Sequence, residues 1–162
     1  MSSIRAQTPA RIVMIGSGNV ATHLAAAFAG VADVVQVYSP TAEHAAALAA
    51  KTGAEAVADI GSIAADADYY IVAVRDEAMP ALAAGLRGRG FDCGIWAHTT
   101  GSMPLDALDG IGEACGVFYP MQTFTRDVAV DMGRVPVFVE ASTDEAAESL
   151  CRLGRMITAR WP

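Results

Sequence analysis

The sequence predicts a three-layer α/β domain built on a doubly wound, mostly parallel β-sheet. Short β-branched runs alternate along the chain with longer alanine-rich stretches of helical character, which is the pattern of successive β-α-β units. Several of the short runs are apolar at consecutive positions, as expected for strands that helices cover on both faces. At 162 residues, without a repeat or a linker, the chain fits one domain.

Seven apolar runs are expected to form the strands. They span residues 11–15, 34–38, 55–58, 69–74, 94–98, 116–119 and 135–139. Two alanine-rich stretches between them, 20–29 and 41–51, are expected to be helices that end at Gly30 and Gly53. The second helix opens after Pro40, since proline is tolerated at the start of a helix.

A last helix is expected from Ser142 toward Met156. Ser142 and Glu145 have the spacing of a capping box, in which two side chains satisfy main-chain N–H groups at a helix start. Apolar residues at helical spacing then define one buried face of this helix: Ala146, Leu150, Leu153 and Ile157. Trp161 is expected to cover an apolar face near the end of the chain.

The composition excludes several classes of function. The chain has 11 Lys and Arg against 18 Asp and Glu, a formal charge of −7, and its densest basic run, 87–89, holds only two arginines. This balance repels phosphate backbones and anionic lipids, so neither a nucleic acid nor a membrane is expected as a partner. An uncharged stretch of 21 residues between Arg11 and Asp33 is interrupted after four apolar residues, which argues against a membrane span and an export signal. A soluble, cytoplasmic protein is expected.

The three cysteines, Cys93, Cys115 and Cys151, lie far apart and form no CxxC pair. Their odd number and spacing argue against a disulfide framework and a zinc site. No other group of His, Asp, Glu or Cys has the spacing of metal ligands. We therefore expect buried, inert thiols and no bound metal.

The segment GSGNVA, residues 16–21, follows the first expected strand and opens the first expected helix. A GxGxxA sequence in this context is typical of dinucleotide binding by a Rossmann-type fold. Gly16 permits the tight turn, Gly18 lets the main chain approach a pyrophosphate, and a small residue at position 21 allows close helix packing. Binding is expected at Gly16, Ser17, Gly18, Asn19 and Val20, whose N–H groups face the anion at the helix start. The alternative is a glycine turn that only connects strand to helix.

The end of the second strand decides which dinucleotide is expected. An acidic side chain there would hold the ribose hydroxyls of NAD, but residues 37–41 read VYSPT, without Asp or Glu. Since a carboxylate would also repel a 2′-phosphate, its absence favours NADP over NAD, with Ser39 and Thr41 as hydroxyl donors. No arginine stands there to pair with the phosphate, and Ser39 could equally serve only to cap the next helix.

Five segments occur in a distinctive order and spacing: IVMIGSGNVATHLAAAF, VVQVYSPT, DYYIVAVRDEAM, AHTTGSMPLDAL and GVFYPMQTFT. They resemble the N-terminal Rossmann-like domain of a family classed as NADP oxidoreductases and similar to pyrroline-5-carboxylate reductase. HTTGS and FYPMQTF are the most distinctive parts, and the resemblance covers nearly the whole chain. It implies that NADP lies across the carboxyl ends of the strands.

The resemblance also implies a second, helical domain of unknown function that closes the cleft and commonly forms a homodimer. Residues 1–162 hold no counterpart of that domain, so the whole chain is expected to be the dinucleotide-binding domain. Pro40 replaces a basic residue that often follows the Tyr-Ser pair in the family, and this departure weighs against NADP.

The remaining candidates should gather around one crevice, because ligands of doubly wound sheets bind outside the carboxyl ends of the strands. By analogy with related reductases, the adenosine side is bordered by Val74 and Arg75, and the nicotinamide side by Thr99, Thr100 and Gly101. Alternatively, Arg75 forms only a solvated ion pair with the aspartate that follows it.

His98 is the candidate proton donor, because it stands at the end of an expected strand and imidazole titrates near neutral pH. The alternative is a structural imidazole that hydrogen-bonds the adjoining loop, since no Asp or Glu that could orient it is apparent. Tyr119, Gln122 and Thr123 are candidates for orienting a small-molecule substrate by hydrogen bonds. Ser102 lacks the flanks of a nucleophile elbow and is expected to cap the turn that follows it.

The sequence therefore predicts the cofactor-binding domain of an NADP-dependent oxidoreductase that acts on a small carbonyl or imine compound. A noncatalytic NADP(H)-binding module, serving as a redox sensor or scaffold, is the first alternative, because no substrate domain is apparent. An S-adenosylmethionine-dependent methyltransferase also has a glycine loop after its first strand. The GxGxxA spacing and the missing acidic residue after the second strand count against it.

Overall fold

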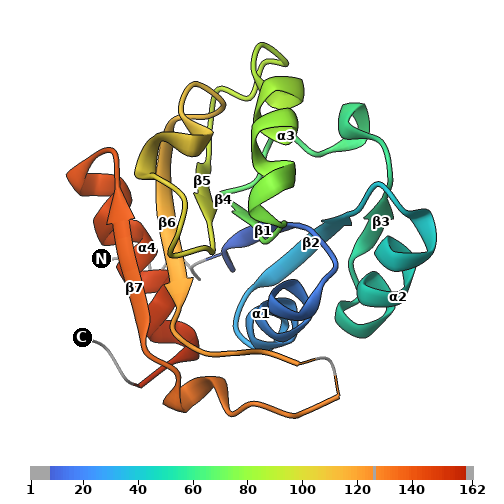
Figure 1. Cartoon of the computed structure of the whole chain (residues 1–162), viewed down its shortest axis with the longest axis vertical. Coiled ribbons are helices and arrows are strands. Elements are labelled where there is room, and N and C mark those ends of the chain that lie inside the picture. Colours follow the sequence, from blue (N-terminus) through green and yellow to red (C-terminus); the bar gives the residue numbers. More distant parts are fainter. Residues whose placement is uncertain (1–7, 126, 160–162) are drawn as a thin grey trace, which may run out of the picture.

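A seven-stranded sheet forms the middle layer of the molecule (Figure 1). The structure, a computed structural model, describes residues 8–125 and 127–159, so Trp161 lies outside the described residues. The strands are β1 (Arg11–Ile15), β2 (Asp33–Tyr38), β3 (Glu55–Val57), β4 (Tyr69–Val72), β5 (Ile95–His98), β6 (Ala114–Pro120) and β7 (Val137–Ala141). Their spatial order is β3-β2-β1-β4-β5-β6-β7, with parallel pairing throughout except for β7, which is antiparallel to β6. This arrangement confirms the predicted mostly parallel sheet.

Helices cover both faces of the sheet. They are α1 (Asn19–Ala29), α2 (Ala42–Thr52), α3 (Met79–Leu86) and α4 (Asp144–Ile157), with the short 3-10 turns η1 (Ile60–Ser62), η2 (Asp76–Ala78), η3 (Leu105–Leu108) and η4 (Met132–Arg134). Side chains of α1, α2 and α4 share one apolar core, and those of α3 and η3 belong to the core on the other face. Gly30 and Gly53 follow the ends of α1 and α2, as predicted. Among the described residues, no helix is both long enough and apolar enough to cross a membrane.

Alternating side chains of the central strand β1 supply the two cores. Ile12 and Met14 belong to the core under α1, α2 and α4, whereas Val13 and Ile15 belong to the opposite core. All four side chains are fully buried. Burying a side chain of this size contributes about 1.5–3 kcal/mol, so β1 is a rigid base for the loop that follows it.

The helix α3 was not predicted from the sequence pattern. Its segment MPALAAGL is short, and it carries Pro80 at its start and Gly85 near its end, both of which weaken a helical pattern. Proline is accommodated in the first turn because its missing N–H would have no partner there. Burial of Met79, Ala83 and Leu86 against the sheet stabilises the helix.

The last strand begins two residues later than the predicted range 135–139. The Val135 N–H donates to the Met132 carbonyl oxygen at 3.1 Å, so this residue closes η4 and does not pair with β6. The strand β7 then runs antiparallel to β6, with Phe138 opposite Tyr119. The other six strands agree with the predicted ranges to within two residues at each end.

The start of α4 corrects the predicted capping box. Thr143, and not Ser142, caps the helix: its hydroxyl accepts a hydrogen bond from the Ala146 N–H at 3.1 Å. The Ser142 hydroxyl instead accepts from the N–H of Cys115 on β6, at 3.1 Å. Two adjacent hydroxyl residues offer the helix two starting points, and the contact with β6 selects between them.

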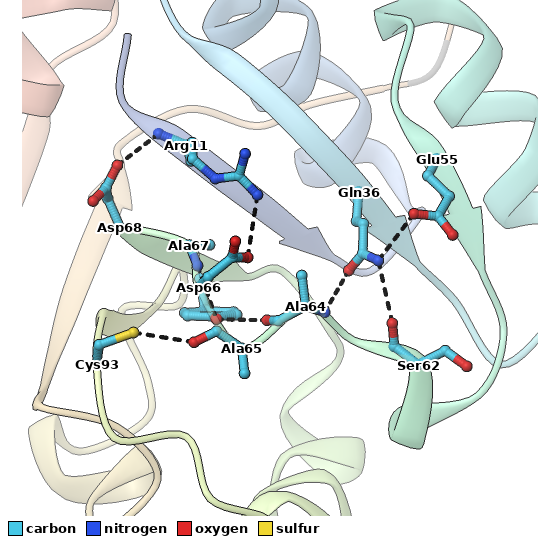
Figure 2. A network of polar contacts seen from close by, with 11 residues as sticks. Arg11, Gln36, Glu55, Ser62, Ala64, Ala65, Asp66, Ala67, Asp68 and Cys93 are labelled. Atoms are coloured by element: carbon cyan, nitrogen blue, oxygen red, sulfur yellow. Dashed lines mark hydrogen bonds and ion pairs between the residues drawn. The ribbon is translucent and has the colours of Figure 1, made fainter. Parts of the chain in front are cut away.

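A buried glutamine on β2 fixes the connection between β3 and β4 (Figure 2). The Gln36 side chain is only 6% exposed, and its Oε1 accepts from the Ala64 N–H at 2.7 Å. Its Nε2 donates to the Ser62 carbonyl and to the Glu55 carboxylate, each at 3.2 Å. Both ends of the amide are therefore paired, as burial requires. Sequence analysis does not predict this network, because its members come from separate segments.

The cysteines differ in part from the prediction of three buried thiols. Cys115 is buried, whereas Cys93 and Cys151 are partly exposed. Cys93 Sγ donates to the Ala65 carbonyl oxygen at 3.0 Å (Figure 2). Partial burial, together with the neighbouring Asp92 carboxylate, raises the pKa of the Cys93 thiol. Since the thiolate is the reactive form, this raised pKa makes Cys93 a poor nucleophile at neutral pH.

Candidate functional site

The carboxyl ends of β1 and β4 lie side by side at the point where the strand order reverses. From β1 the chain continues to β2 and β3 on one side, and from β4 it continues to β5 and β6 on the other. Ligands of doubly wound sheets bind in the crevice outside this point. The loops that follow β1, β2, β4, β5 and β6 therefore define the candidate site.

Gly16 makes the tight turn between β1 and α1. Its φ of +119° lies in the region that favours glycine, and a Cβ at this position would lie 2.2 Å from the Ala73 carbonyl oxygen. Its N–H donates to the Tyr38 carbonyl oxygen at 2.8 Å. The turn is thus held between the ends of β2 and β4 and has no room for a side chain.

Gly18 directly precedes α1 and has an open environment. No atom of another segment lies within 4 Å of the position that a Cβ would take. Across residues 8–125 and 127–159, no acceptor is bonded to the N–H of Ser17 or Gly18. The first turn of α1 holds no acidic side chain, and Ala21 is fully buried. N–H groups at the positive end of a helix dipole suit an anion such as a pyrophosphate, so the loop fits a dinucleotide.

The two hydroxyl residues after β2 have different environments. Ser39 is buried, and its Oγ accepts hydrogen bonds from the Ser17 hydroxyl at 3.1 Å and from the Thr41 N–H at 3.3 Å. Thr41 is the exposed residue that precedes α2, and its side chain makes no capping hydrogen bond. Ser39 therefore ties the glycine loop to the start of α2, while the Thr41 hydroxyl faces solvent.

A small hollow of about 80 Å³ lies beside the glycine loop, between α1 and α2. Its lining includes Ser17, His44 and Lys51. The loop after β2 contains no basic residue, but these two basic side chains of α2 stand next to Ser17. Sequence analysis assigned neither of them to the cofactor site, because they lie in the helix and not in the loop.

The loop after β4 places Val74 beside the glycine turn. The Val74 Cγ1 lies 3.5 Å from the Cβ position of Gly16, and the Ala73 N–H donates to the Ile15 carbonyl oxygen at 2.8 Å. Arg75 precedes η2 and is exposed. Within the described ranges, no ion pair joins it to Asp76. The structure thus brings Val74 to the predicted site and places Arg75 in solvent at its border.

The loop after β5 passes from the sheet to the surface. Thr99 is buried and its N–H donates to the Val72 carbonyl oxygen at 3.2 Å, whereas Thr100 is half-buried and Gly101 is exposed. Ring carbons of Tyr119 on β6 lie 3.1 Å from the Cβ position of Gly101. The predicted substrate residue Tyr119 therefore lies next to Gly101, one of the residues predicted to border the nicotinamide.

His98 is fully buried, and both of its ring nitrogens are engaged. Nδ1 accepts from the Thr100 N–H at 3.3 Å, which assigns the ring proton to Nε2, and Nε2 donates to the Pro104 carbonyl oxygen at 2.9 Å. The ring thus holds the loop of residues 99–104 at two points. An imidazole in this arrangement offers no ring nitrogen to a substrate, so the geometry favours the structural alternative over a proton donor.

The sequence predicted that Ser102 caps the turn that follows it. The structure shows that its side chain bonds elsewhere. Its hydroxyl donates to the Asp76 carboxylate, on the loop after β4. Its Oγ also lies 2.9 Å from the Thr100 hydroxyl, and its N–H donates to the same hydroxyl at 3.2 Å. No sequence signal predicts this cluster, because Asp76 and Ser102 follow different strands.

The other two predicted substrate residues, Gln122 and Thr123, are exposed on the segment that follows β6. They line a hollow of about 290 Å³ together with residues 128–131 and Arg134. No residue of the loop after β5 lines this hollow. The structure therefore does not place Gln122 and Thr123 in one hollow with the predicted nicotinamide-side residues.

Two residues of α1 hold the segment after β6. Asn19 Nδ2 donates to the Phe124 carbonyl oxygen at 3.2 Å, and His23 Nε2 lies 2.9 Å from the Thr125 carbonyl oxygen. The His23 ring also lies against the Phe124 ring, with centroids 5.0 Å apart. Sequence analysis placed Asn19 in the binding loop and gave His23 no role. Their spacing of four residues, which puts both on one helix face, is the only signal that could have joined them.

A larger hollow, of about 980 Å³, opens at the opposite, amino end of the strands. Carboxylates dominate its charged lining, which includes Asp66, Asp68, Glu113 and Glu145. Nearby, the Arg11 guanidinium pairs with Asp66 at 3.1 Å (Figure 2). Such a lining repels the phosphates of a dinucleotide, so this hollow is not the candidate site.

Comparison with known proteins identifies relatives of this chain. Residues 11–90 match the family described as NADP oxidoreductase, coenzyme F420-dependent. The chain is 38% identical to a Bacteroides fragilis protein classed as an NADP oxidoreductase, whose crystal structure matches with a TM-score of 0.89 over 95% of this chain and 60% of that one. The expected resemblance is thereby confirmed, and the chain spans only about 60% of the length of this relative. Comparison with curated proteins finds no match.

More distant crystal structures share the architecture. Prephenate dehydrogenase from Aquifex aeolicus, in complex with hydroxyphenyl propionate and NAD+, has a TM-score of 0.78 at 11% identity, over 98% of this chain and 60% of that one. The 1-pyrroline-5-carboxylate reductase of Streptococcus pyogenes has a TM-score of 0.70 at 10% identity, over 91% of this chain and 56% of that one. These two likenesses establish the Rossmann-like fold alone.

Proposed function

We propose that this chain, whose residues 11–90 match the family described as NADP oxidoreductase, coenzyme F420-dependent, binds NADP(H) and serves hydride transfer to or from a small carbonyl or imine compound. The observation that carries the proposal is the glycine loop. Gly16 is required by the turn, and Gly18 leaves the main chain open beside a helix start. The N–H groups of Ser17 and Gly18 would hold the pyrophosphate. When bound, the nicotinamide supplies or accepts the hydride.

Three features of the loop after β2 and of the helix α2 support NADP over NAD. Residues 37–42 contain no carboxylate that would hold two ribose hydroxyls and repel a 2′-phosphate. The exposed Thr41 hydroxyl can donate to a phosphate oxygen. The basic side chains of His44 and Lys51 line the hollow beside Ser17 and would attract the same phosphate.

The loop after β5 would border the nicotinamide, and His98 would position it. Because each ring nitrogen of His98 is bonded to the main chain of this loop, the imidazole sets where Thr99, Thr100 and Gly101 stand. We assign His98 this positioning role, in which it does not give a proton to the substrate.

A noncatalytic NADP(H)-binding module is the second candidate function. The burial of His98 favours it, since the residue expected to act as proton donor is engaged on both sides. The two candidates share the cofactor site and differ only in turnover.

Calorimetric titration of this chain with NADPH, NADH and S-adenosylmethionine tests the cofactor site. We expect NADPH to bind more tightly than NADH, and S-adenosylmethionine not to bind. Gly18→Val should raise the Kd for NADPH by about 100-fold or more, because its side chain occupies the space of the phosphates, while the open environment preserves the fold. Gly30→Ala, at the far end of α1, is the matched control and should keep the original affinity. Unchanged affinity in a folded Gly18→Val variant contradicts the site.

Turnover separates the two candidate functions. NADPH oxidation is followed spectroscopically with a panel of aldehydes, ketones and cyclic imines. Oxidation that depends on one member of the panel establishes an enzyme. Tight NADPH binding without oxidation by any member supports the noncatalytic module.

A further inference from the structure

A polar cluster that includes the predicted Thr100 joins the loops after β4 and β5. The Ser102 hydroxyl donates to Asp76 Oδ2, although the two residues are 26 positions apart in the chain. The Thr100 and Ser102 hydroxyl oxygens lie 2.9 Å apart. Asp76 is partly exposed and Ser102 is exposed, so a ligand can reach both.

The positions of the protons decide what this cluster can bind. A serine hydroxyl carries one proton, and that of Ser102 is donated to Asp76. The Thr100 hydroxyl must then donate to Ser102 Oγ, while it accepts from the Ser102 N–H at 3.2 Å. One lone pair of Ser102 and the second carboxylate oxygen of Asp76 remain, and both are acceptors. The cluster therefore presents negative charge and no donor to a ligand.

From this arrangement we propose that Asp76 and Ser102 recognise a protonated nitrogen of the substrate. It is either an iminium or the ammonium that forms when hydride adds to the iminium carbon and the resulting amine takes up one proton from water. The inference rests on the proposed function and narrows its substrate class, because a neutral carbonyl group has only acceptors and would face acceptors here. An N–H cation instead forms charge-assisted hydrogen bonds with the cluster. Across the described ranges, Asp76 forms no ion pair that a ligand would have to displace.

The cluster lies among the residues predicted to border the nicotinamide. Val74, two residues before Asp76, lies against the glycine turn. Gly101, next to Ser102, lies beside Tyr119, with ring carbons 3.1 Å from its Cβ position. The proposal therefore also places Tyr119 near the substrate.

The test measures binding of pyrrolidine, which is a cation at neutral pH, and of its neutral ring analogue tetrahydrofuran, to the chain saturated with NADP+. We expect NMR titration to detect pyrrolidinium binding and to show tetrahydrofuran binding at least about tenfold more weakly. Asp76→Asn should weaken pyrrolidinium binding by about tenfold or more, because the amide still accepts from Ser102 but carries no charge. NADP+ affinity should stay unchanged.

Glu77→Gln is the matched control. It removes the same charge from the adjacent exposed residue of η2 and should leave pyrrolidinium binding as it was. Ser102→Ala is the second variant and should also weaken pyrrolidinium binding, so the proposal stays testable if Asp76→Asn fails to fold.

The outcomes separate this inference from the proposed function. Absence of NADP+ binding by the original chain overturns both. With NADP+ bound, three results overturn the cation site alone: no pyrrolidinium binding, equal binding of the two probes, or equal effects of the Asp76 and Glu77 variants. Loss of pyrrolidinium binding in the Asp76 and Ser102 variants, at full NADP+ affinity and with Glu77→Gln unaffected, supports it.

Discussion

The two ends of the same sheet present opposite chemistry. At the carboxyl end, the loop of Gly16 and Gly18 offers main-chain N–H groups at a helix start, with no carboxylate in the first turn of α1. At the amino end, a much larger hollow of about 980 Å³ is lined by several carboxylates. The end proposed to bind the cofactor is therefore not the end with the larger hollow. The sign of the charge that each end presents is the better guide, because a dinucleotide brings phosphates.

At the carboxyl end of the sheet, the two loop glycines also differ from each other. Replacing Gly16 is expected to have the largest effect on the free energy of unfolding. Gly16→Ala should lower the free energy of unfolding by about 3 kcal/mol, because the added Cβ collides with the Ala73 carbonyl oxygen at a positive φ. Gly18→Ala is the matched control. It should change the free energy of unfolding by less than about 1 kcal/mol, since nothing lies near its Cβ position. Urea unfolding measures both, and equal losses would show that the two glycines do not differ as described.

His98→Ala is expected to have the next largest effect. It removes two buried hydrogen bonds and leaves a cavity, so the free energy of unfolding should fall by about 2–3 kcal/mol and NADPH affinity should fall with it. His98→Gln keeps one donor and one acceptor and should restore part of both. A residue that gave a proton to the substrate would behave differently. His98→Gln would then keep NADPH affinity and slow turnover, which kcat measured at saturating NADPH would reveal.

Adding one negative charge at each end of the sheet sharpens the comparison. Thr41→Asp should raise the Kd for NADPH by about tenfold through repulsion of the 2′-phosphate. It should not raise the Kd for NADH, because a carboxylate there can accept hydrogen bonds from the ribose hydroxyls. Aspartate is a good residue before a helix, so α2 should keep its stability. Thr8→Asp makes the same change in the hollow at the amino end and should leave both affinities unchanged. Calorimetric titration decides. A similar weakening by both variants would mean that net charge, and not the end of the sheet, controls binding.

The smallest effect is expected from Tyr70, which stabilises the amino end. Its hydroxyl donates to the Ala64 carbonyl at 2.6 Å and accepts from the Ala67 N–H at 3.2 Å. Tyr70→Phe should cost about 1 kcal/mol at neutral pH and leave NADPH affinity unchanged. Urea unfolding and calorimetric titration give the two values, and a loss of NADPH affinity would contradict the separation of the two ends.

Tyr70 also makes the free energy of unfolding depend on pH. Burial raises the pKa of Tyr70 to about 12 from an ordinary value of 10.0, so folding favours the neutral phenol. Its contribution to stability is fully present below pH 10 and is lost as the pH rises toward 12. The excess of the free energy of unfolding of the original chain over that of Tyr70→Phe should therefore shrink as the pH rises above 10. A constant difference between them would show that the hydroxyl does not titrate as described.

Sequence patterns predicted correctly those parts of the fold that depend on residues close together in the chain. The strand β1, the Gly16 turn and the start of α1 are consecutive in the chain, and their residue types require a strand, a tight turn and a helix in that order. The same holds for the ends of α1 and α2. The helix α3 escaped prediction because burial against the sheet, and not its own sequence, stabilises it.

The site was predictable only where it follows from one segment. The glycine loop could be located from six residues, but the bond between Asp76 and Ser102 joins loops from two strands. The role of His98 depends on which main-chain atoms surround its ring, and a sequence does not contain that information. The capping error at Ser142 has the same origin, since its partner is Cys115 on another strand.

The grip of α1 on the segment after β6 has a mechanical consequence. Asn19 and His23 stand on successive turns of one helix and clasp adjacent carbonyl groups of that segment. The start of α1 and the segment after β6 are thus held together at two points. If ligand binding shifts the start of α1, the residues next to Gln122 and Thr123 would move with it. This motion requires no movement of the sheet.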